Sequence, residues 1–175
     1  MRKIIKDKAI VDDHWNVFKL TEGESPETVS VPAGQQIVPL QVWLTQKTAL
    51  SARKDIAVWL ASDERAEQLK EDIAALPLIA VDFPAFSDGR GYSIAFNLRS
   101  RLGYEGEIRA VGDVLRDQLF YMQRVGFNAF ATREDRSIED ALKGLTDFSD
   151  VYQTSWDQKT PLYRRASRPA VQDLP

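Results

Sequence analysis

Residues 78–117 read LIAVDFPAFSDGRGYSIAFNLRSRLGYEGEIRAVGDVLRD, and this stretch decides the fold. The apolar run 78–81 predicts a buried strand, and apolar residues spaced four apart between 94 and 102 indicate a helix after it. A second apolar run at 107–111 precedes another helix, which Gly126 ends. Two strand–loop–helix units therefore follow one another, as in parallel α/β folds, where ligands bind at the loops after the strands.

Similar units extend outward from this stretch in both directions. Strand-like runs begin near residues 40, 56, 78, 107, 127 and 150, with helix-like segments between most of them. We expect an α/β fold with a mostly parallel sheet of about six strands, helical crossovers and an N-terminal β-hairpin. An open three-layer sheet is the first expectation, and a half (β/α) barrel is the alternative because the units are short.

Several boundaries follow from the same patterns. The hairpin is predicted to pair residues 2–6 with 15–19, and a last short strand is predicted at 151–153. Between them we predict a strand at 38–44, a short helix at 45–54 and a helix over 63–76.

Domain organisation is expected to be simple. Residues 1–155 form a single α/β domain, and 156–175 form a C-terminal tail whose prolines and scattered charges suggest no core of its own. Arg164, Arg165 and Arg168 make this tail locally basic, so it is either a solvated tail or a docking arm.

Composition excludes several classes of protein. The chain of 175 residues carries a formal net charge of -3, which argues against non-specific nucleic-acid binding. No apolar run approaches the roughly 20 residues of a membrane span, and residues 1–7 lack the apolar core of a secretory signal. We therefore expect no nucleic-acid or membrane partner and a cytoplasmic location.

Cysteine is absent, and His14 is the only histidine. A thiolate nucleophile, a disulfide and a Cys-ligated iron–sulfur cluster are therefore impossible, and a multi-histidine metal site cannot form. We expect no metal site, and we interpret His14 as a surface turn residue.

The loop at 87–93, SDGRGYS, opens the first helix of the central stretch. Backbone amides at a helix N-terminus can hold an anion, Gly89 and Gly91 allow close approach, and Arg90 beside Asp88 could clamp the anion. The structural alternative is that Asp88 caps the helix and Arg90 pairs with a nearby carboxylate.

Further polar residues follow the two central strands. Asp82 and Asp113 are the candidate catalytic residues, because a partly buried carboxylate can act as an acid or a base. Asp113 could instead serve only as a helix cap. Arg116 completes the candidate anion-binding set with Asp88, Gly89, Arg90 and Gly91. We expect one cleft to be lined by Asp82, Asp88, Arg90, Asp113 and Arg116.

The sequence carries no cofactor fingerprint. The G-x-G at 89–91 lacks the third glycine of a dinucleotide motif, since Ile94 occupies that position, and no Walker A sequence is present. NADPH and flavin therefore have no motif to support them, and the cofactor is left unassigned.

Three segments carry a resemblance to a known family: FPAFSDGRGYSIA (83–95), LRSRLGYEGEIRAVGDVLRDQL (98–119) and RVGFNAF (124–130). They resemble a bacterial domain-of-unknown-function family whose genes lie beside those for sulfite reductase. Its members carry the label of oxidoreductases of sulfite reduction. The resemblance implies an accessory protein or an oxidoreductase of assimilatory sulfite reduction, within sulfate assimilation and cysteine biosynthesis. Sulfite reductase is the implied partner and would supply the metal centres.

Two other functions fit the residues. One is a small enzyme that binds an anionic metabolite through Arg90 and uses Asp82 or Asp113 as acid or base. The other is a non-catalytic assembly module, in which every carboxylate of the predicted cleft would be paired with an arginine.

Overall fold

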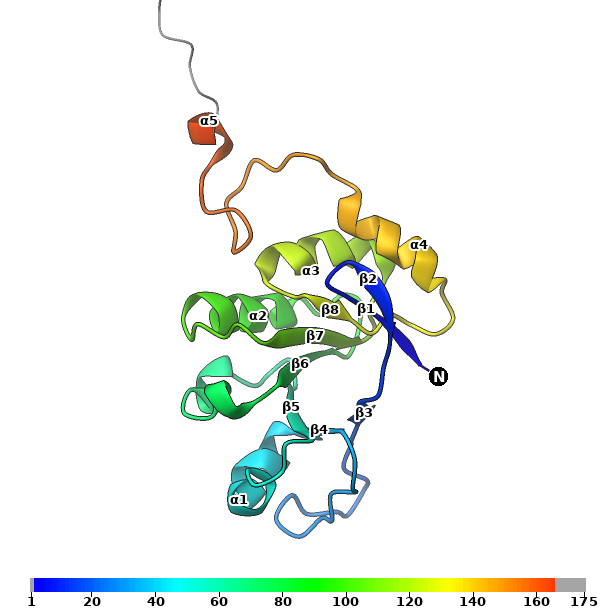
Figure 1. Cartoon of the computed structure of the whole chain (residues 1–175), viewed down its shortest axis with the longest axis vertical. Helices are drawn as coiled ribbons and strands as arrows, with labels where there is room; N and C mark the ends of the chain where they lie inside the picture. The colour runs from blue at the N-terminus through cyan, green and yellow to red at the C-terminus, as the bar shows by residue number, and fades with distance from the viewer. Residues whose placement is uncertain (1, 166–175) are drawn as a thin grey trace, which may run out of the picture.

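The computed structural model describes residues 2–165, and their strands form one eight-stranded sheet (Figure 1). The strands are β1 (Lys3–Lys6), β2 (Ala9–Asp12), β3 (Asn16–Val17), β4 (Gln36–Pro39), β5 (Ile56–Leu60), β6 (Leu78–Phe83), β7 (Glu107–Gly112) and β8 (Ala129–Phe130). The α-helices are α1 (Leu40–Leu50), α2 (Arg90–Ser100), α3 (Leu119–Val125), α4 (Ile138–Lys143) and α5 (Leu162–Arg165). Residues 166–175 of the expected tail, including Arg168, lie outside the described residues.

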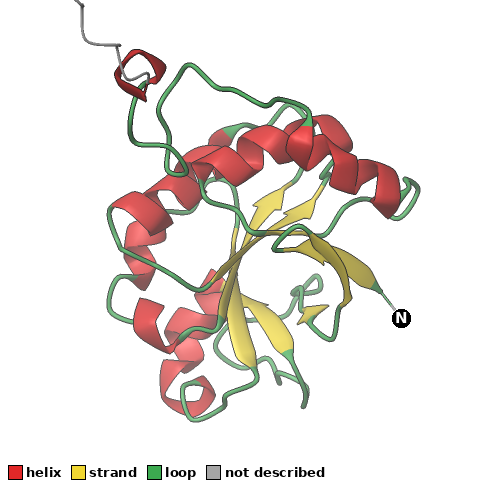
Figure 2. Ribbon diagram, turned by 45° about the horizontal axis from the view of Figure 1, so that its top comes forward, coloured by secondary structure: helices red, strands yellow, loops and turns green. Residues whose placement is uncertain are grey.

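The sheet is curled into a half barrel. Its strand order is β2-β1-β8-β7-β6-β5-β4-β3, with β3 to β8 parallel and β1 antiparallel to both of its neighbours. Because strands β3 to β8 lie in chain order, each right-handed crossover places its helix on the same face. The helices accordingly follow the convex side of the sheet (Figure 2). The expected α/β class is confirmed, and of the two arrangements considered the half barrel fits.

A three-residue link joins the opposite edges of this sheet. Strand β2 ends at Asp12 and β3 begins at Asn16, although the two strands lie at the two ends of the strand order. Four residue steps span at most about 14 Å, so the edges must lie close together. The two edges of the half barrel therefore approach each other at this point, and residues 13–15 cross the gap between them.

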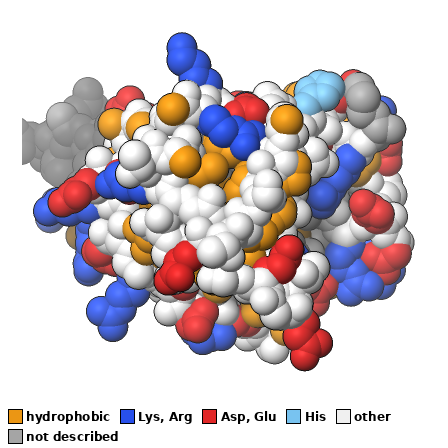
Figure 3. Space-filling model, turned by 90° about the horizontal axis from the view of Figure 1, so that it is seen from below, with side chains coloured by type: hydrophobic (Ala, Val, Ile, Leu, Met, Phe, Trp, Pro, Cys, Tyr) orange, Lys and Arg blue, Asp and Glu red, His pale blue; other side chains and the backbone are white. Residues whose placement is uncertain are grey.

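Two apolar layers pack on the two faces of the sheet. The larger core lies on the convex side between the strands and the helices. A smaller cluster lines the concave side and consists of Ile4, Ile37, Ala57, Leu78, Ala80, Val111 and Ala131, with Val11, Trp15, Val17 and Trp59 packed against it. On the surface, acidic and basic side chains are interspersed over the face seen from below (Figure 3).

The structure corrects four of the predicted boundaries. The hairpin pairs β1 with β2, and the predicted second strand at 15–19 shrinks to β3 at the far edge. The apolar run 38–44 divides where β4 ends at Pro39 and α1 begins at Leu40, because one face of that helix also needs apolar residues.

The other two corrections concern segments with weak regular structure. The helix predicted over 63–76 is reduced to two short 3-10 turns, Ala66–Leu69 and Ile73–Ala75. The strand predicted at 151–153 is irregular, because no neighbouring strand pairs with it among the described residues.

Candidate functional site

The loops after β6 and β7 meet at the carboxyl edge of the sheet. The Asp113 amide donates to the Phe83 carbonyl at 2.7 Å, and the Phe86 amide donates to Asp113 Oδ2 at 2.9 Å. The side chain of Gln118 also donates to the Phe86 carbonyl, at 3.3 Å. The two loops converge as the sequence predicts, but the Asp113 side chain ties them together and does not cap a helix.

Asp88 and Arg90 form a tight pair at the start of α2. Arg90 Nη2 lies 2.7 Å from Asp88 Oδ2, and both the Arg90 Nε and its amide donate to Asp88 Oδ1. The Arg90 guanidinium is the main reason that the pKa of the Asp88 carboxyl lies well below its usual range, and Ser62 adds to the effect. The pairing of Arg90 agrees with the structural alternative for the loop, but Asp88 does not cap the helix, because Gly89 occupies the N-cap of α2.

The two glycines of this loop have different surroundings. A Cβ at Gly91 would lie 2.7 Å from the ring of the fully buried Phe83, so glycine is required there for α2 to pack on β6. A Cβ at Gly89 would meet nothing closer than 3.6 Å. Gly91 therefore serves packing, which is a sufficient reason for its presence.

Asp113 and Arg116 belong to separate ion pairs. Arg133, in the loop after β8, lies 3.1 Å from Asp113 and 2.8 Å from Asp135. Arg116 points the other way, lying 2.8 Å from Asp147 and 3.4 Å from Asp140. Each predicted cation at this edge, like Arg133, is thus bound to a carboxylate.

Asp82 differs from its neighbours. Its side chain is half-buried, and among residues 2–165 no ion pair includes it. Burial raises the pKa of the Asp82 carboxyl, an effect that nearby Lys19 opposes and the charge of Asp88 reinforces. Gly112, with φ of +93°, lies against it, because an added Cβ would lie 2.8 Å from Asp82 Oδ1.

The five residues expected to line one cleft are therefore divided among several groups. Arg90 lines a surface pocket beside the loop after β5, whereas Arg116 lines another between the loops after β7 and β8. Within the described part of the chain, no three His, Asp or Glu side chains gather in a way that could hold a metal ion.

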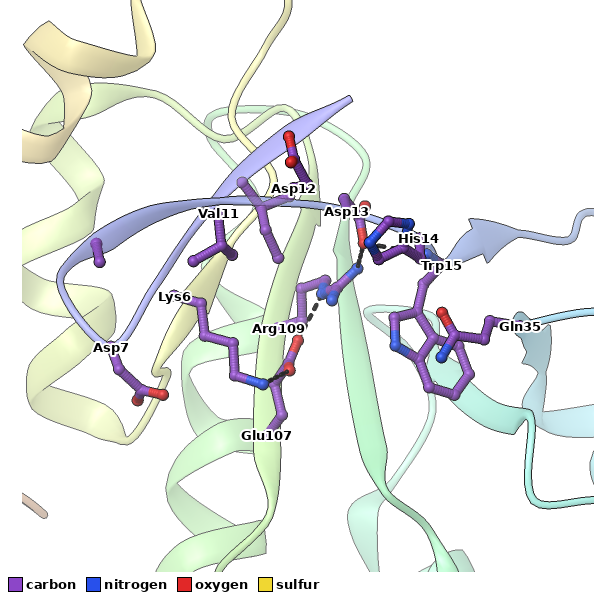
Figure 4. Close-up of a pocket in the computed structure, with 12 residues that line it drawn as sticks. Lys6, Asp7, Val11, Asp12, Asp13, His14, Trp15, Gln35, Glu107 and Arg109 are labelled. Carbon is purple, nitrogen blue, oxygen red and sulfur yellow. Dashed lines mark hydrogen bonds and ion pairs between the residues drawn. The ribbon is translucent and has the colours of Figure 1, made fainter. Parts of the chain in front are cut away.

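A buried charge network on the concave face was not predicted from the sequence. It borders a pocket of about 530 Å³ between the β1–β2 hairpin and β7 (Figure 4). The Arg109 guanidinium lies between two carboxylates, with Nη1 2.8 Å from Asp13 Oδ1 and Nε 2.7 Å from Glu107 Oε1. Lys6 Nζ lies 2.8 Å from Glu107 Oε2. The side chains of Arg109, Asp13 and Glu107 are only 3%, 2% and 7% exposed.

A signal for part of this network was present in the sequence. Glu107 and Arg109 lie two positions apart in an apolar strand, so both side chains must point to the same face of the sheet. Asp13 could not have been paired with Arg109 in this way, since 96 positions separate them. The network holds the 13–15 link across the sheet, and His14 lies exposed at the pocket's rim.

Comparison with known protein families places most of the chain in one family model. Residues 57–163 match the model of a family described as a bacterial protein of unknown function, DUF934. A search of curated proteins found none that matches. The matched range runs from β5 to α5 and contains the whole carboxyl-edge region described above. Among residues 2–165, no helix has the length and apolar character needed to cross a membrane.

Proposed function

We propose that this chain, which belongs to the bacterial family of unknown function DUF934, is a non-catalytic accessory protein of assimilatory sulfite reduction that binds sulfite reductase. The resemblance of residues 83–130 to proteins encoded beside sulfite reductase supports the pathway. The family is described as one of unknown function, so the match does not indicate an activity. The choice between an accessory protein and an oxidoreductase therefore depends on the site.

The main support for an accessory role is that the charged side chains at the carboxyl edge form ion pairs with one another. Proton transfer needs a carboxyl group that can change its protonation state near the working pH. Asp88 is held by Arg90, which lowers the pKa of its carboxyl and favours the charged form, and Asp113 is held by Arg133 at 3.1 Å. Arg90 and Arg116 are likewise engaged, so little positive charge is left for an anionic substrate. These are the features expected of an assembly module.

Two measurements test this role. A strain lacking the gene should grow poorly with sulfate as the sole sulfur source and recover when cysteine is added. The purified chain should bind the purified sulfite reductase of the same bacterium in a calorimetric titration. Normal growth of the deletion strain on sulfate, together with no binding, would refute the proposal.

Asp82 favours a second candidate, a small enzyme acting on an anionic metabolite. It is the one predicted catalytic carboxylate at this edge that is half-buried and has no ion pair in the described residues, and burial raises its pKa. Such a carboxyl can exchange a proton, and Lys19 provides a nearby positive charge.

The conservative variant Asp82→Asn separates the two candidates. If the chain is an accessory protein, a strain carrying Asp82→Asn should grow on sulfate as the wild type does, because nothing in the proposed role needs a proton at that atom. If the chain is an enzyme, growth should be lost although reductase binding is unchanged and thermal stability is not lowered. Asp113→Asn serves as the comparison variant, since it weakens a structural pair and should lower stability.

A further inference from the structure

The chain leaves the half barrel after α4 and continues as residues 147–165, which we call the aromatic arm. It extends away from the sheet and contains one short helix, α5 (Figure 1). Most of its attachments are polar: Arg116 binds Asp147 at 2.8 Å, and Arg124 donates to the Gln153 carbonyl and to Asp157. The ring of Phe148 also packs edge-on against that of Phe120, with the two ring centres 5.0 Å apart. None of its residues belongs to the buried core. The arm is therefore fixed to the body at a few points but hardly buried.

Large aromatic side chains project from this arm into solvent. Phe148 is 65% exposed, Tyr152 81% and Tyr163 76%. The other exposed large apolar side chains of the described residues, Phe86, Phe96 and Tyr121, reach only 50%, 39% and 50%. Exposed aromatic side chains on a segment without a core contribute nothing to the stability of the fold. At protein interfaces, in contrast, tyrosine supplies much of the binding energy.

Basic side chains accompany these rings. Lys159 Nζ lies 4.8 Å from the centre of the Trp156 ring, and the Arg164 guanidinium lies 5.6 Å from that of Tyr163. Throughout residues 2–165, the ion pairs within 4.0 Å include neither of these cations, although most other arginines are paired. Within residues 147–165, Asp147 and Asp157 are paired with arginines of the body, whereas Asp150 and the cations Lys159, Arg164 and Arg165 are in none of these ion pairs. The unpaired charge of the arm is therefore mostly positive, on a chain whose net charge is -3.

The family match includes residues 147–163 of the arm and ends just before Arg164. It extends to Tyr163, well past α4 and the last element that contributes to the core. Most of the arm is thus part of the region that the family shares, whereas the hairpin β1–β2 at the other end is not.

We infer that the aromatic arm is the surface through which this chain binds a partner protein, and that the partner's contacting surface is acidic. Tyr152 and Tyr163 fill apolar depressions on the partner, and Lys159 and Arg164 pair with carboxylates around them. The inference deepens the proposed function and rests on it, so the partner used in the test is sulfite reductase.

The test measures the affinity of the full-length chain for purified sulfite reductase by calorimetric titration. The double variant Tyr152→Ala/Tyr163→Ala and the charge-reversal variant Lys159→Glu/Arg164→Glu should each weaken binding at least about tenfold. Wild-type binding should also weaken as salt is added. The matched control is Phe96→Ala/Arg101→Glu, which removes an exposed aromatic and a cation from α2 and the residue after it and should leave the affinity unchanged.

Each possible result bears on a different claim. Arm variants that bind like the wild type would overturn the inference and leave the proposed function standing. Failure of the wild type itself to bind would remove both. If the arm variants instead abolish self-association of the chain, measured by sedimentation, the arm is covered by a second copy and the inference is wrong. The arm variants should unfold at the wild-type temperature, since the arm contributes nothing to the core.

Discussion

Replacing Arg109 by methionine should destabilise the protein severely. The substitution keeps an apolar stem of similar length, but it leaves Asp13 and Glu107 facing a space with no guanidinium, and both side chains are less than a tenth exposed. Removing one partner of a buried pair typically costs about 3–5 kcal/mol, because the remaining charge is desolvated without compensation. Stabilities of whole domains are only about 5–15 kcal/mol, so the loss is a large share.

The assay is urea unfolding followed by tryptophan fluorescence, with a thermal melt beside it. At about 2–4 °C per kcal/mol for a chain of this size, Arg109→Met should lower Tm by about 6–20 °C. Adding Asp13→Asn should restore part of the loss, because it removes one uncompensated charge and keeps an oxygen for the Trp15 amide. That recovery would identify buried charge, and not lost packing, as the cause.

The control is Arg101→Met. Arg101 and Glu67 form a pair at 3.8 Å with both side chains well exposed, so its removal should cost under about 1 kcal/mol. The reasoning is refuted if Arg109→Met costs no more than Arg101→Met, since the network would then not be shielded from water.

Four further substitutions test other parts of the structure by urea unfolding. Gly91→Ala should cost about 1–3 kcal/mol, because the new Cβ collides with the buried Phe83 ring, whereas Gly89→Ala should be near neutral; equal effects would contradict this. Ser137→Ala should cost about 0.5–2 kcal/mol by removing the side-chain cap of α4, and an unchanged midpoint would count against that cap. Burial raises the pKa of Asp82, so its contribution to stability falls as pH rises through that pKa. Asp82→Asn should therefore stabilise the fold at pH 7 and have little effect below about pH 4; a loss of stability at pH 7 would reverse the sign.

The central units illustrate how far sequence patterns reach. The strand at 78–81 and the helix over 94–102 correspond closely to β6 and α2, because apolar spacing reports directly which face of an element is buried. The run 38–44 was wrongly predicted to be one strand. Strand β4 and the first turn of α1 are both apolar, so the spacing of apolar residues does not mark where the strand ends and the helix begins. The sequence left two arrangements possible, an open sheet and a half barrel. The half barrel follows from the order of the strands in the sheet, which local sequence patterns do not determine.

In the candidate site, too, the sequence predicted the positions of residues but not most of their partners. Asp82, Asp88, Arg90 and Asp113 were all placed at the carboxyl edge by the sequence, because each lies at the end of a recognisable strand or in the segment that follows it. Their partners were not predictable, except for Asp88 and Arg90, which are two residues apart. Arg133 reaches Asp113 from another loop, 20 positions further along the chain.

Sequence alone determined the class of fold, the order of the central elements and the absence of any thiol chemistry, because these depend on composition and on spacing within one element. Tertiary structure decided which charges meet. The link across the half barrel carries Asp13 to Arg109, and the exposure of the arm leaves Lys159 and Arg164 without carboxylate partners among residues 2–165. The physical reason is that an ion pair depends on distance in space, and a curled sheet brings together residues whose separation along the chain gives no hint of it.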